Sequence, residues 1–217
     1  MSLAIFDLDN TLLRGDSDYA WGQFLIEHRL VDGEAYRREN ERYYAQYQAG
    51  TLDIAAFLAF SLRPLANQDR ATLDAWHREY MQTKISPMIT PQARVLVKKH
   101  RTQGNTLVIV TSTNRFITAP IAKEFGVEHL LATELEEENG RFTGKVAGIP
   151  CFREGKVKRL RAWLKEHNET LKESWCYSDS HNDIPLLKIV ENPVAVNPDE
   201  QLQKYARGRG WPIITLR

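Results

Sequence analysis

Short apolar segments alternate with amphipathic segments over much of the chain. The apolar segments are rich in β-branched and aromatic side chains and predict buried strands at residues 3–8, 106–111, 174–178, 193–196 and 212–215. The segments around them repeat apolar residues at helical spacing and predict helices at residues 90–103, 115–125, 156–167, 183–190 and 199–206. Gly104 and Gly126 follow two of these helices, where helices commonly end. This alternation predicts a parallel sheet with helices on both faces.

Residues 16–87 break the alternation. They contain no convincing strand and read as several amphipathic helices, one of them starting after the potential capping residue Asp53. Pro87 and Pro91 mark the return to the alternating pattern. We therefore expect a core domain formed by residues 1–15 and 88–217 and a helical cap subdomain at 16–87. Residues 133–146 form a smaller insertion, in which Asn139-Gly140 predicts a hairpin turn.

The composition excludes several classes of protein. Apolar residues make up 42% of the chain, charged residues 26%, and the formal net charge is +1, which argues against disorder and against nucleic-acid binding. No stretch approaches the ~20 apolar residues of a membrane span, and the N-terminus lacks the basic start of a signal peptide. Cys151 and Cys176 predict two reduced thiols. We expect a cytoplasmic protein without nucleic-acid or membrane partners, and the sequence does not predict its oligomeric state.

The first candidate for chemistry is Asp7-Leu-Asp-Asn-Thr11, directly after the first apolar segment. A carboxylate can attack phosphorus and form an acyl-phosphate. A second carboxylate two residues later faces the same way on an extended backbone and can act as general acid and base. By itself the motif is weak, because it also resembles part of a calcium-binding loop. The glycine and distal glutamate of such a loop are missing at the required offsets.

A second acidic motif, Ser178-Asp-Ser-His-Asn-Asp183, follows another apolar segment. The carboxyl ends of parallel strands meet at one edge of a sheet, so Asp179 and Asp183 should approach Asp7 and Asp9. Two like charges about 4 Å apart repel by about 4 kcal/mol at an effective dielectric constant of about 20, so such a cluster calls for a cation. Hard oxygen ligands favour Mg²⁺. For either motif alone, carboxylates that merely cap helices remain an alternative.

Two further segments fit the same chemistry. Thr111-Ser-Thr113 ends the second strand and can offer hydrogen bonds to a phosphoryl oxygen, although serine and threonine at such junctions are often only helix caps. Lys156 lies near the start of a predicted helix and can neutralise a carboxylate and a phosphoryl oxygen. A lysine considered singly is more often a solvated surface residue.

Together and in this order, the four elements resemble the haloacid dehalogenase (HAD) superfamily, and they look closest to its phosphoserine-phosphatase-like branch with a helical cap. The similarity covers nearly the whole chain and includes the Thr133-Glu-Leu…Gly140-Arg-Phe-Thr-Gly144 and Gly155-Lys156-Val157 segments. Four motifs in order are far more specific than any one of them. The resemblance implies an α/β fold, with a Rossmann-like parallel sheet core and an inserted helical cap subdomain.

The resemblance also implies a Mg²⁺-dependent hydrolysis of a small-molecule phosphate ester. Asp7 would form an aspartyl-phosphate, and Asp9 would protonate the leaving alcohol and then activate water. Mg²⁺ would be held by the carboxylates of Asp7 and Asp179 and by the backbone carbonyl of Asp9. The remaining implied roles are phosphate binding by Thr111, Ser112 and Lys156, support of the metal shell by Asp183, and contact of Asn182 with Asp7 or Lys156.

The chain departs from the phosphoserine-phosphatase pattern in three places. Thr111-Ser-Thr stands where that branch has Ser-Gly-Gly, and Tyr177-Ser-Asp179 stands where Gly-Asp is usual. In the cap, Gly50-Thr-Leu-Asp-Ile-Ala-Ala-Phe57 resembles a family segment. The position of the family arginine that would bind a substrate carboxylate falls near Ala59, so that arginine is missing here. Bidentate recognition by arginine is hard to replace, so phosphoserine is disfavoured as the substrate.

The entrance of the cap offers Asp16 and Asp18 instead, which could hold an ammonium group. Some proteins that look like this one are assigned as histidinol-phosphate phosphatases, whose substrate is cationic apart from its phosphate. Aromatic residues of the cap could stack on a substrate ring, although aromatics at helical spacing are more often core residues. Two other functions remain open: phosphotransfer to an acceptor other than water, and a phosphate-binding regulatory protein that is phosphorylated on Asp7.

Overall fold

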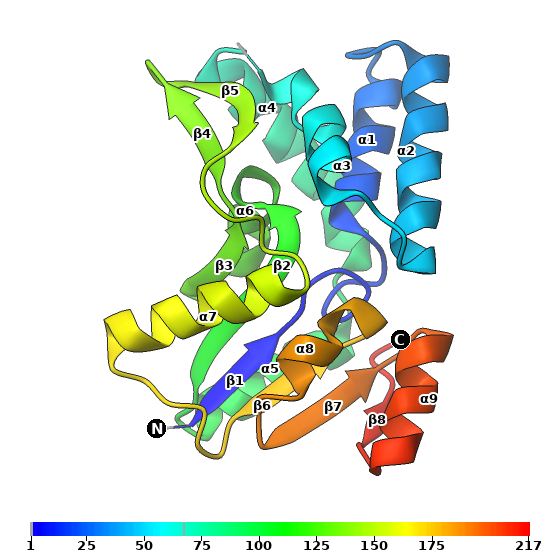
Figure 1. The fold of residues 1–217 in the computed structure, drawn as a ribbon. Coiled ribbons are helices and arrows are strands. Elements are labelled where there is room, and N and C mark those ends of the chain that lie inside the picture. Colours follow the sequence, from blue (N-terminus) through cyan, green and yellow to red (C-terminus); the bar gives the residue numbers. More distant parts are fainter. Residues whose placement is uncertain (1, 67) are drawn as a thin grey trace.

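A computed structural model describes residues 2–66 and 68–217 of the chain. In these residues, a parallel sheet of six strands has the order β3-β2-β1-β6-β7-β8 (Figure 1). The strands are β1 (Leu3–Phe6), β2 (Thr106–Asn114), β3 (His129–Thr133), β6 (Trp175–Ser178), β7 (Asn192–Val196) and β8 (Ile213–Ile214). Phe6 pairs with Ile109 on one side and Tyr177 on the other, so β1, β2 and β6 reach the same edge together. This register brings the residues after each strand together.

Helices cover both faces of the sheet, and β1 is therefore buried on both of its faces. Ala4 and Phe6 belong to one apolar cluster with residues of α5 (Pro91–Thr102) and α6 (Arg115–Glu124). Leu3 and Ile5 belong to a second cluster with residues of α7 (Glu154–His167), α8 (Ile184–Leu187) and α9 (Glu200–Arg209). All four β1 side chains are fully buried, as the continuous apolar segment predicts for a central parallel strand. The predicted α/β fold is confirmed.

Residues 16–87, here called the helical insertion, follow β1 and lie beyond its carboxyl end (Figure 1). They contain α1 (Ser17–Glu27), α2 (Gly33–Ala49), α3 (Ile54–Ser61), α4 (Arg70–Tyr80) and a π-helical turn, Met81–Ile85. Asp53 caps α3 as predicted, accepting hydrogen bonds from the amides of Ala55 and Ala56. Trp21 and Tyr80 share the apolar cluster of Phe6, so α1 and α4 are packed onto the core rather than separate from it. The subdomain boundaries stay a prediction.

Some predicted elements differ in extent from those of the structure. The predicted hairpin is present as β4 (Leu135–Glu138) paired antiparallel with β5 (Arg141–Val146). The edge strand β3 was not predicted, because its His-Leu-Leu-Ala-Thr sequence has a single β-branched residue and two leucines that favour helix equally. The β2 strand continues to Asn114 instead of ending at residue 111, and α8 (Ile184–Leu187) ends three residues before the predicted residue 190.

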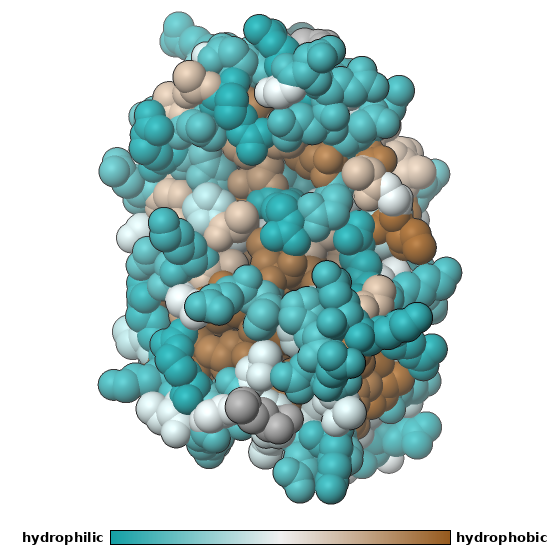
Figure 2. Space-filling view, turned by 90° about the vertical axis from the view of Figure 1, so that its left-hand side faces the viewer, coloured by the Kyte–Doolittle hydropathy of each residue, from teal (hydrophilic) through white to brown (hydrophobic). Residues whose placement is uncertain are grey.

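Figure 2 views the molecule from the left-hand side of Figure 1. Hydrophilic residues cover most of this face, and hydrophobic residues are set back among them. The large hydrophobic side chains that are clearly exposed in the described chain are Val95, Ile149 and Ile213, which are scattered in the sequence. Across the described residues, every helix is too short or too polar to cross a membrane.

Candidate active site

The two acidic motifs meet at the carboxyl edge of the sheet. Asp7 directly follows β1, and Asp179 directly follows β6. The hydroxyl of Thr11 lies 3.3 Å from Asp7 Oδ2 and 3.1 Å from Asp179 Oδ1, within donating distance of both carboxylates. Asp7 is 4% exposed and Asp179 8% exposed, so two carboxylates lie close together and away from water. The parallel register of β1 and β6 produces this meeting.

Lys156 reaches this cluster from the first turn of α7. Its ammonium group donates to Asp7 Oδ1 and to Asp183 Oδ2, each at 2.7 Å, and the residue is 1% exposed. Burial lowers the pKa of Lys156, but the charges of Asp183 and Asp7 outweigh burial and raise the pKa above its ordinary value. Asp183 also accepts a hydrogen bond of 2.8 Å from the Ser178 hydroxyl. Lys156 is therefore a buried cation between two carboxylates and not a solvated surface residue.

Burial also shifts the carboxyl groups. It raises the pKa of Asp7 to about 7, with Lys156 opposing the shift and the nearby charges of Asp183 and Asp9 adding to it. Burial raises the pKa of Asp179 well above its ordinary value, and the charges of Asp7 and Asp183 add to the shift. Since burial and like charges both disfavour ionisation, this cluster would be stabilised by a further cation.

Asp9 is held in a fixed orientation beside the end of β2. Its Oδ1 accepts from the Ser17 amide at 2.7 Å, and its Oδ2 accepts from the hydroxyls of Thr113 at 2.9 Å and Thr111 at 3.4 Å. The Thr111 hydroxyl in turn accepts from the Thr113 amide at 3.2 Å. Burial raises the pKa of Asp9, while the hydrogen bonds from Ser17 and Thr113 lower it. A carboxyl group with a raised pKa is suited to donating a proton near neutral pH.

The donor set fits Mg²⁺ better than a softer metal. Asp7 and Asp179 offer hard carboxylate oxygens that both lie within reach of the Thr11 hydroxyl. Their raised pKa values mean that a nearby positive charge would stabilise the ionised carboxylates. In residues 2–66 and 68–217, no three His, Cys, Asp or Glu side chains are grouped so that they could hold a metal by themselves. A magnesium ion here would take its other ligands from backbone, water and substrate, as Mg²⁺ commonly does.

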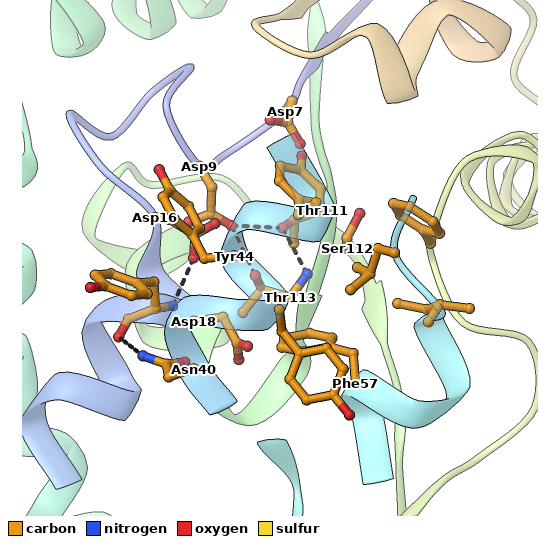
Figure 3. A pocket seen from close by; sticks show the side chains of 16 residues that line it. Asp7, Asp9, Asp16, Asp18, Asn40, Tyr44, Phe57, Thr111, Ser112 and Thr113 are labelled. Carbon is orange, nitrogen blue, oxygen red and sulfur yellow. Dashed lines mark hydrogen bonds between the residues drawn. The ribbon is translucent and has the colours of Figure 1, made fainter. Parts of the chain in front are cut away.

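A cavity of about 50 Å³, measured as space for water centres, lies between the sheet edge and the helical insertion. In Figure 3, Asp7 lies at the top of the view, Asp9 and Thr111 below it, and Asp18 and Phe57 lower still. Ser112, half-buried, also lines the cavity. The side that belongs to the helical insertion is largely aromatic: Tyr19, Tyr43, Tyr44, Tyr47 and Phe57.

The two acids predicted to select the substrate both line this cavity but differ in their bonding. Asp16 is the N-cap of α1, and its Oδ1 accepts from the Tyr19 amide at 2.8 Å. The carboxylate of Asp18, which is 9% exposed, has no hydrogen bond or ion pair with any described residue. Burial raises the pKa of Asp18 to about 7, and the charge of Asp9 adds to the shift. Asp18 is thus a buried, unpartnered carboxyl group at the cavity.

The predicted contact of Asn182 with Asp7 or Lys156 is wrong for the described structure. Its side-chain amide donates to Ser180 Oγ at 3.2 Å and to the Tyr47 carbonyl at 3.4 Å, and its Oδ1 accepts from Arg153 Nε at 2.9 Å. The short turn His181–Asp183 explains the difference. It directs Asp183 toward Lys156 and leaves Asn182 facing the helical insertion.

Sequence reasoning assigned no role to several residues that the structure brings to the site. Thr11 and Thr113 belong to motifs that were recognised, but a motif does not say which hydroxyl contacts which carboxylate. The aromatic residues that line the cavity, here called the aromatic wall, could be anticipated only from the high aromatic content of the helical insertion. Tyr19 and Tyr44 line the cavity without joining the core cluster, Tyr36 and Tyr80 belong to the core cluster alone, and Tyr43 does both. Helical spacing alone does not separate these two groups.

Comparison with known proteins agrees with this geometry. The model of the family described as haloacid dehalogenase-like hydrolase matches residues 4–188. The chain belongs to this family. A histidinol-phosphatase of Neisseria meningitidis serogroup C is 47% identical over 100% of this chain and 99% of its own length. A phosphoserine phosphatase of Mycobacterium tuberculosis is 33% identical over 99% of this chain and 70% of its own length.

Two solved structures have the same architecture. A protein of unknown function from Bordetella pertussis Tohama I superposes with a TM-score of 0.94 at 45% identity, covering 100% of this chain and 99% of that one. A phosphoserine phosphatase captured as a phospho-aspartyl intermediate analogue superposes with a TM-score of 0.73, covering 100% and 93%. Its identity of 18% supports the fold alone. The chain is a phosphatase of the HAD-like family with a Rossmann-like α/β core.

Proposed function

We propose that this HAD-like phosphatase is a magnesium-dependent phosphomonoesterase that works through an aspartyl-phosphate on Asp7. The observation that carries the proposal is the buried pairing of Asp7 with Lys156, at a cavity that Asp9 also lines. Asp7 has a neutralising cation at one carboxylate oxygen, which limits the charge that builds up when a phosphoryl group approaches. Asp9 is available on the same cavity for proton transfer.

Two steps follow from this arrangement. In the first, a carboxylate oxygen of Asp7 attacks phosphorus, the bond to the ester oxygen breaks, and Asp9 gives its proton to the departing alcohol. In the second, Asp9 takes a proton from water as that water attacks the phosphoryl group and releases Asp7. Ser17 and Thr113 hold the Asp9 carboxyl group in one orientation for both transfers. The proton count closes, because Asp9 begins and ends each cycle protonated.

Mg²⁺ would be held by the carboxylates of Asp7 and Asp179 and by the backbone carbonyl of Asp9. When bound, it would screen the charge of the phosphoryl group and the carboxylates and orient the ester. Lys156 and Asp183 act beside it. Asp183 fixes the ammonium group of Lys156 through a bond of 2.7 Å, and Lys156 then holds Asp7 in its attacking position. Thr111 and Ser112 line the cavity, and we propose that they contact the phosphoryl oxygens together with Lys156.

For the substrate, we propose a phosphate ester that carries an ammonium group, with histidinol phosphate as the first candidate. The 47% identical relative is named a histidinol-phosphatase. Asp18 supplies an unpartnered carboxyl group for the ammonium, with Asp16 beside it, and the aromatic wall suits a ring. Among the described residues that line the cavity there is no arginine or lysine to pair with a substrate carboxylate, which argues against phosphoserine.

We also propose that the helical insertion moves when such a substrate enters. The cavity volume of about 50 Å³ holds only a few water molecules, since one water needs about 10–15 Å³. We propose that α2 and α3 open for entry and close afterwards, and that closure excludes bulk water from the phosphoenzyme.

The test is phosphate release from histidinol phosphate, phosphoserine, sugar phosphates and nucleotides, with Mg²⁺ and with EDTA. We expect Mg²⁺-dependent release, fastest with histidinol phosphate. Asp7→Asn should abolish release, while the exposed-site control Asp74→Asn should retain it. Release that requires an added alcohol would indicate a phosphotransferase, and a phosphoenzyme that persists would indicate a regulatory protein. No release from any ester would overturn the phosphomonoesterase proposal.

A further inference from the structure

Two side chains from outside the helical insertion, Arg153 and Asn182, bind the carboxyl end of helix α2. Arg153 Nη2 donates to the Gly50 carbonyl at 2.5 Å, and its Nε donates to Asn182 Oδ1 at 2.9 Å. Asn182 in turn donates to the Tyr47 carbonyl at 3.4 Å. The Gly50 carbonyl therefore finds its partner outside the helical insertion, and the Tyr47 carbonyl, which also accepts from the Gly50 amide at 3.1 Å, gains a second donor there. Arg153, Asn182, Tyr47 and Gly50 are called the α2 latch below.

The charges of this contact are complementary. The last carbonyls of a helix carry partial negative charge and lack partners within the helix. Helix α2 has no basic residue in its own last turn. Arg153, which directly precedes α7, provides the missing positive charge from the other side of the cavity. The contact thus joins two parts of the chain that are about a hundred positions apart in sequence.

The fit is close enough to demand glycine at the end of α2. Gly50 has a φ of 72°, and a β-carbon built there would lie 2.5 Å from His181 Nε2. His181 cannot easily give way, because Asp199 holds both its backbone amide at 2.8 Å and its Nδ1 at 2.7 Å. Any side chain at position 50 would therefore hold the end of α2 away from the turn that contains His181.

Arg153 occupies a backbone conformation that disfavours it. Its φ of 48° and ψ of −118° are strained for any residue except glycine. Strain of this kind persists where the surrounding structure demands a particular side chain, and it concentrates at functional sites. The strain at Arg153 is therefore a second observation, beside the hydrogen bonds, that a residue other than glycine is kept at this position.

The α2 latch adjoins both the reacting groups and the cavity wall. The Lys156 amide donates to the Arg153 carbonyl at 3.0 Å, and Asn182 directly precedes Asp183, which holds Lys156. On the cavity side, the rings of Tyr47 and Phe152 lie with their centroids 6.3 Å apart, and both residues line the cavity. Closing the contact therefore sets the wall of the cavity relative to Lys156.

We propose that Arg153 is a positioning residue that holds α2 in the closed position over a bound substrate. It acts through Gly50 and Asn182, and it does not contact the reacting atoms itself. The proposal rests on the proposed phosphatase function for its kinetic consequences, but the contact itself can be tested without any substrate. Two nearby residues thus have different tasks. Lys156 acts on Asp7, and Arg153 acts on α2, which forms part of the opposite wall of the cavity.

The experiment compares Arg153→Gly with Arg153→Lys and with Arg161→Ala, a control at an exposed arginine of α7. Three quantities are measured: melting temperature, hydrogen exchange of the Gly50 and Thr51 amides, and kcat and KM for the best ester of the panel. Both amides bond within the end of α2, to Tyr47 and Gln46, so their exchange reports release of that end.

For Arg153→Gly we expect faster exchange at residues 50–51 and a kcat/KM about tenfold or more below wild type, mostly through KM. The melting temperature should be unchanged or higher, because glycine relieves the backbone strain. A small ester such as p-nitrophenyl phosphate, which does not reach the wall, should lose less than about threefold in kcat/KM. Arg153→Lys should fall between, since one ammonium cannot bridge Gly50 and Asn182 as a guanidinium does.

Exchange and kcat/KM equal to those of Arg161→Ala would overturn the proposal. A fall of melting temperature and kcat/KM together, without faster exchange at residues 50–51, would also overturn it and assign Arg153 a role in stability alone. If wild type releases phosphate from no ester, the proposed function fails, and the exchange measurement still decides whether Arg153 holds α2.

Discussion

The two walls of the cavity are built differently. On the sheet side, the carboxylates of Asp7, Asp9 and Asp183 each accept hydrogen bonds from lysine, threonine, serine or a backbone amide. On the helix side, Asp18 is buried without a partner among the described residues, and most of the other groups are aromatic rings. The sheet side is organised before a substrate arrives, whereas the helix side contains a group that a ligand would complete.

Under the proposed function, this difference separates chemistry from selectivity. Groups that stabilise developing charge work best when they need no reorganisation during the reaction, and the bonded carboxylates around Lys156 meet that condition. A carboxyl group that gains its partner only with the substrate distinguishes esters with an ammonium group from esters without one. Changes on the sheet side should therefore remove activity for all esters, and changes on the helix side should alter preference among them.

The largest effect is expected for Lys156→Met, which would leave Asp7 and Asp183 buried without their cation. We expect phosphate release from every ester to fall by about a thousandfold or more, because the charge opposite the phosphoryl group is lost. Breaking the buried ion pairs should also lower the free energy of unfolding by about 3–5 kcal/mol. Phosphate release and urea unfolding measure the two effects. Lys158→Met, at an exposed position of α7, is the control, and equal behaviour of the two variants would contradict a special role for Lys156.

A smaller and selective effect is expected for Asp18→Asn. Loss of a charge-assisted contact should reduce kcat/KM for histidinol phosphate by about 10–100-fold and leave p-nitrophenyl phosphate nearly unchanged. In wild type, the preference for the ammonium ester should increase as pH rises through about 7, since Asp18 ionises in that range before ligand is bound. The ratio of kcat/KM values between pH 6 and pH 8 measures this. Equal losses for both esters would place Asp18 in the common chemistry and erase the contrast between the walls.

The same contrast explains what could be predicted from the sequence. That Asp7, Asp9, Asp179 and Lys156 lie close together could be predicted because the proposed chemistry requires such residues at strand ends, and parallel register brings strand ends together. The partner of Asn182 and the orientation of Asp18 depend on how α1 and α2 pack against the core, which no local pattern encodes. The β3 strand was missed for a related reason. Its position at the sheet edge is set by pairing with β2, and its own residues favour helix as much as strand.

Stability should also respond to Asp18→Asn, in the direction opposite to activity. The pKa of Asp18 is raised to about 7 in the folded protein from 3.8, so the folded state binds this proton more tightly. Its contribution to stability is therefore present at low pH and lost as pH rises from about 4 through 7. Asparagine removes that loss, and we expect the variant to be more stable than wild type by about 1–4 kcal/mol at pH 8 and nearly equal at pH 4.

Urea unfolding at the two pH values measures this difference. Asp74→Asn, at a largely exposed position on α4, controls for the loss of one negative charge and should change stability by less than about 0.5 kcal/mol. A destabilised Asp18→Asn protein at pH 8 would mean that the carboxylate already has a partner in the free enzyme. Asp18 would then resemble the sheet-side carboxylates, and the helix side would have no group waiting for a ligand.

The smallest effect is expected for Tyr47→Phe, which keeps the ring on the cavity wall and removes only its hydroxyl. That hydroxyl lies near enough to Ser180 for Ser180 to lower the pKa of Tyr47 against the larger effect of burial, and a neutral hydrogen bond there would contribute about 0.5–1.5 kcal/mol, so kcat/KM should change by less than about tenfold. Steady-state kinetics with histidinol phosphate and p-nitrophenyl phosphate measure it. A loss above a hundredfold with both esters would require the hydroxyl to act on the phosphoryl group. The helix side would then take part in the chemistry, and the wall would do more than shape the cavity.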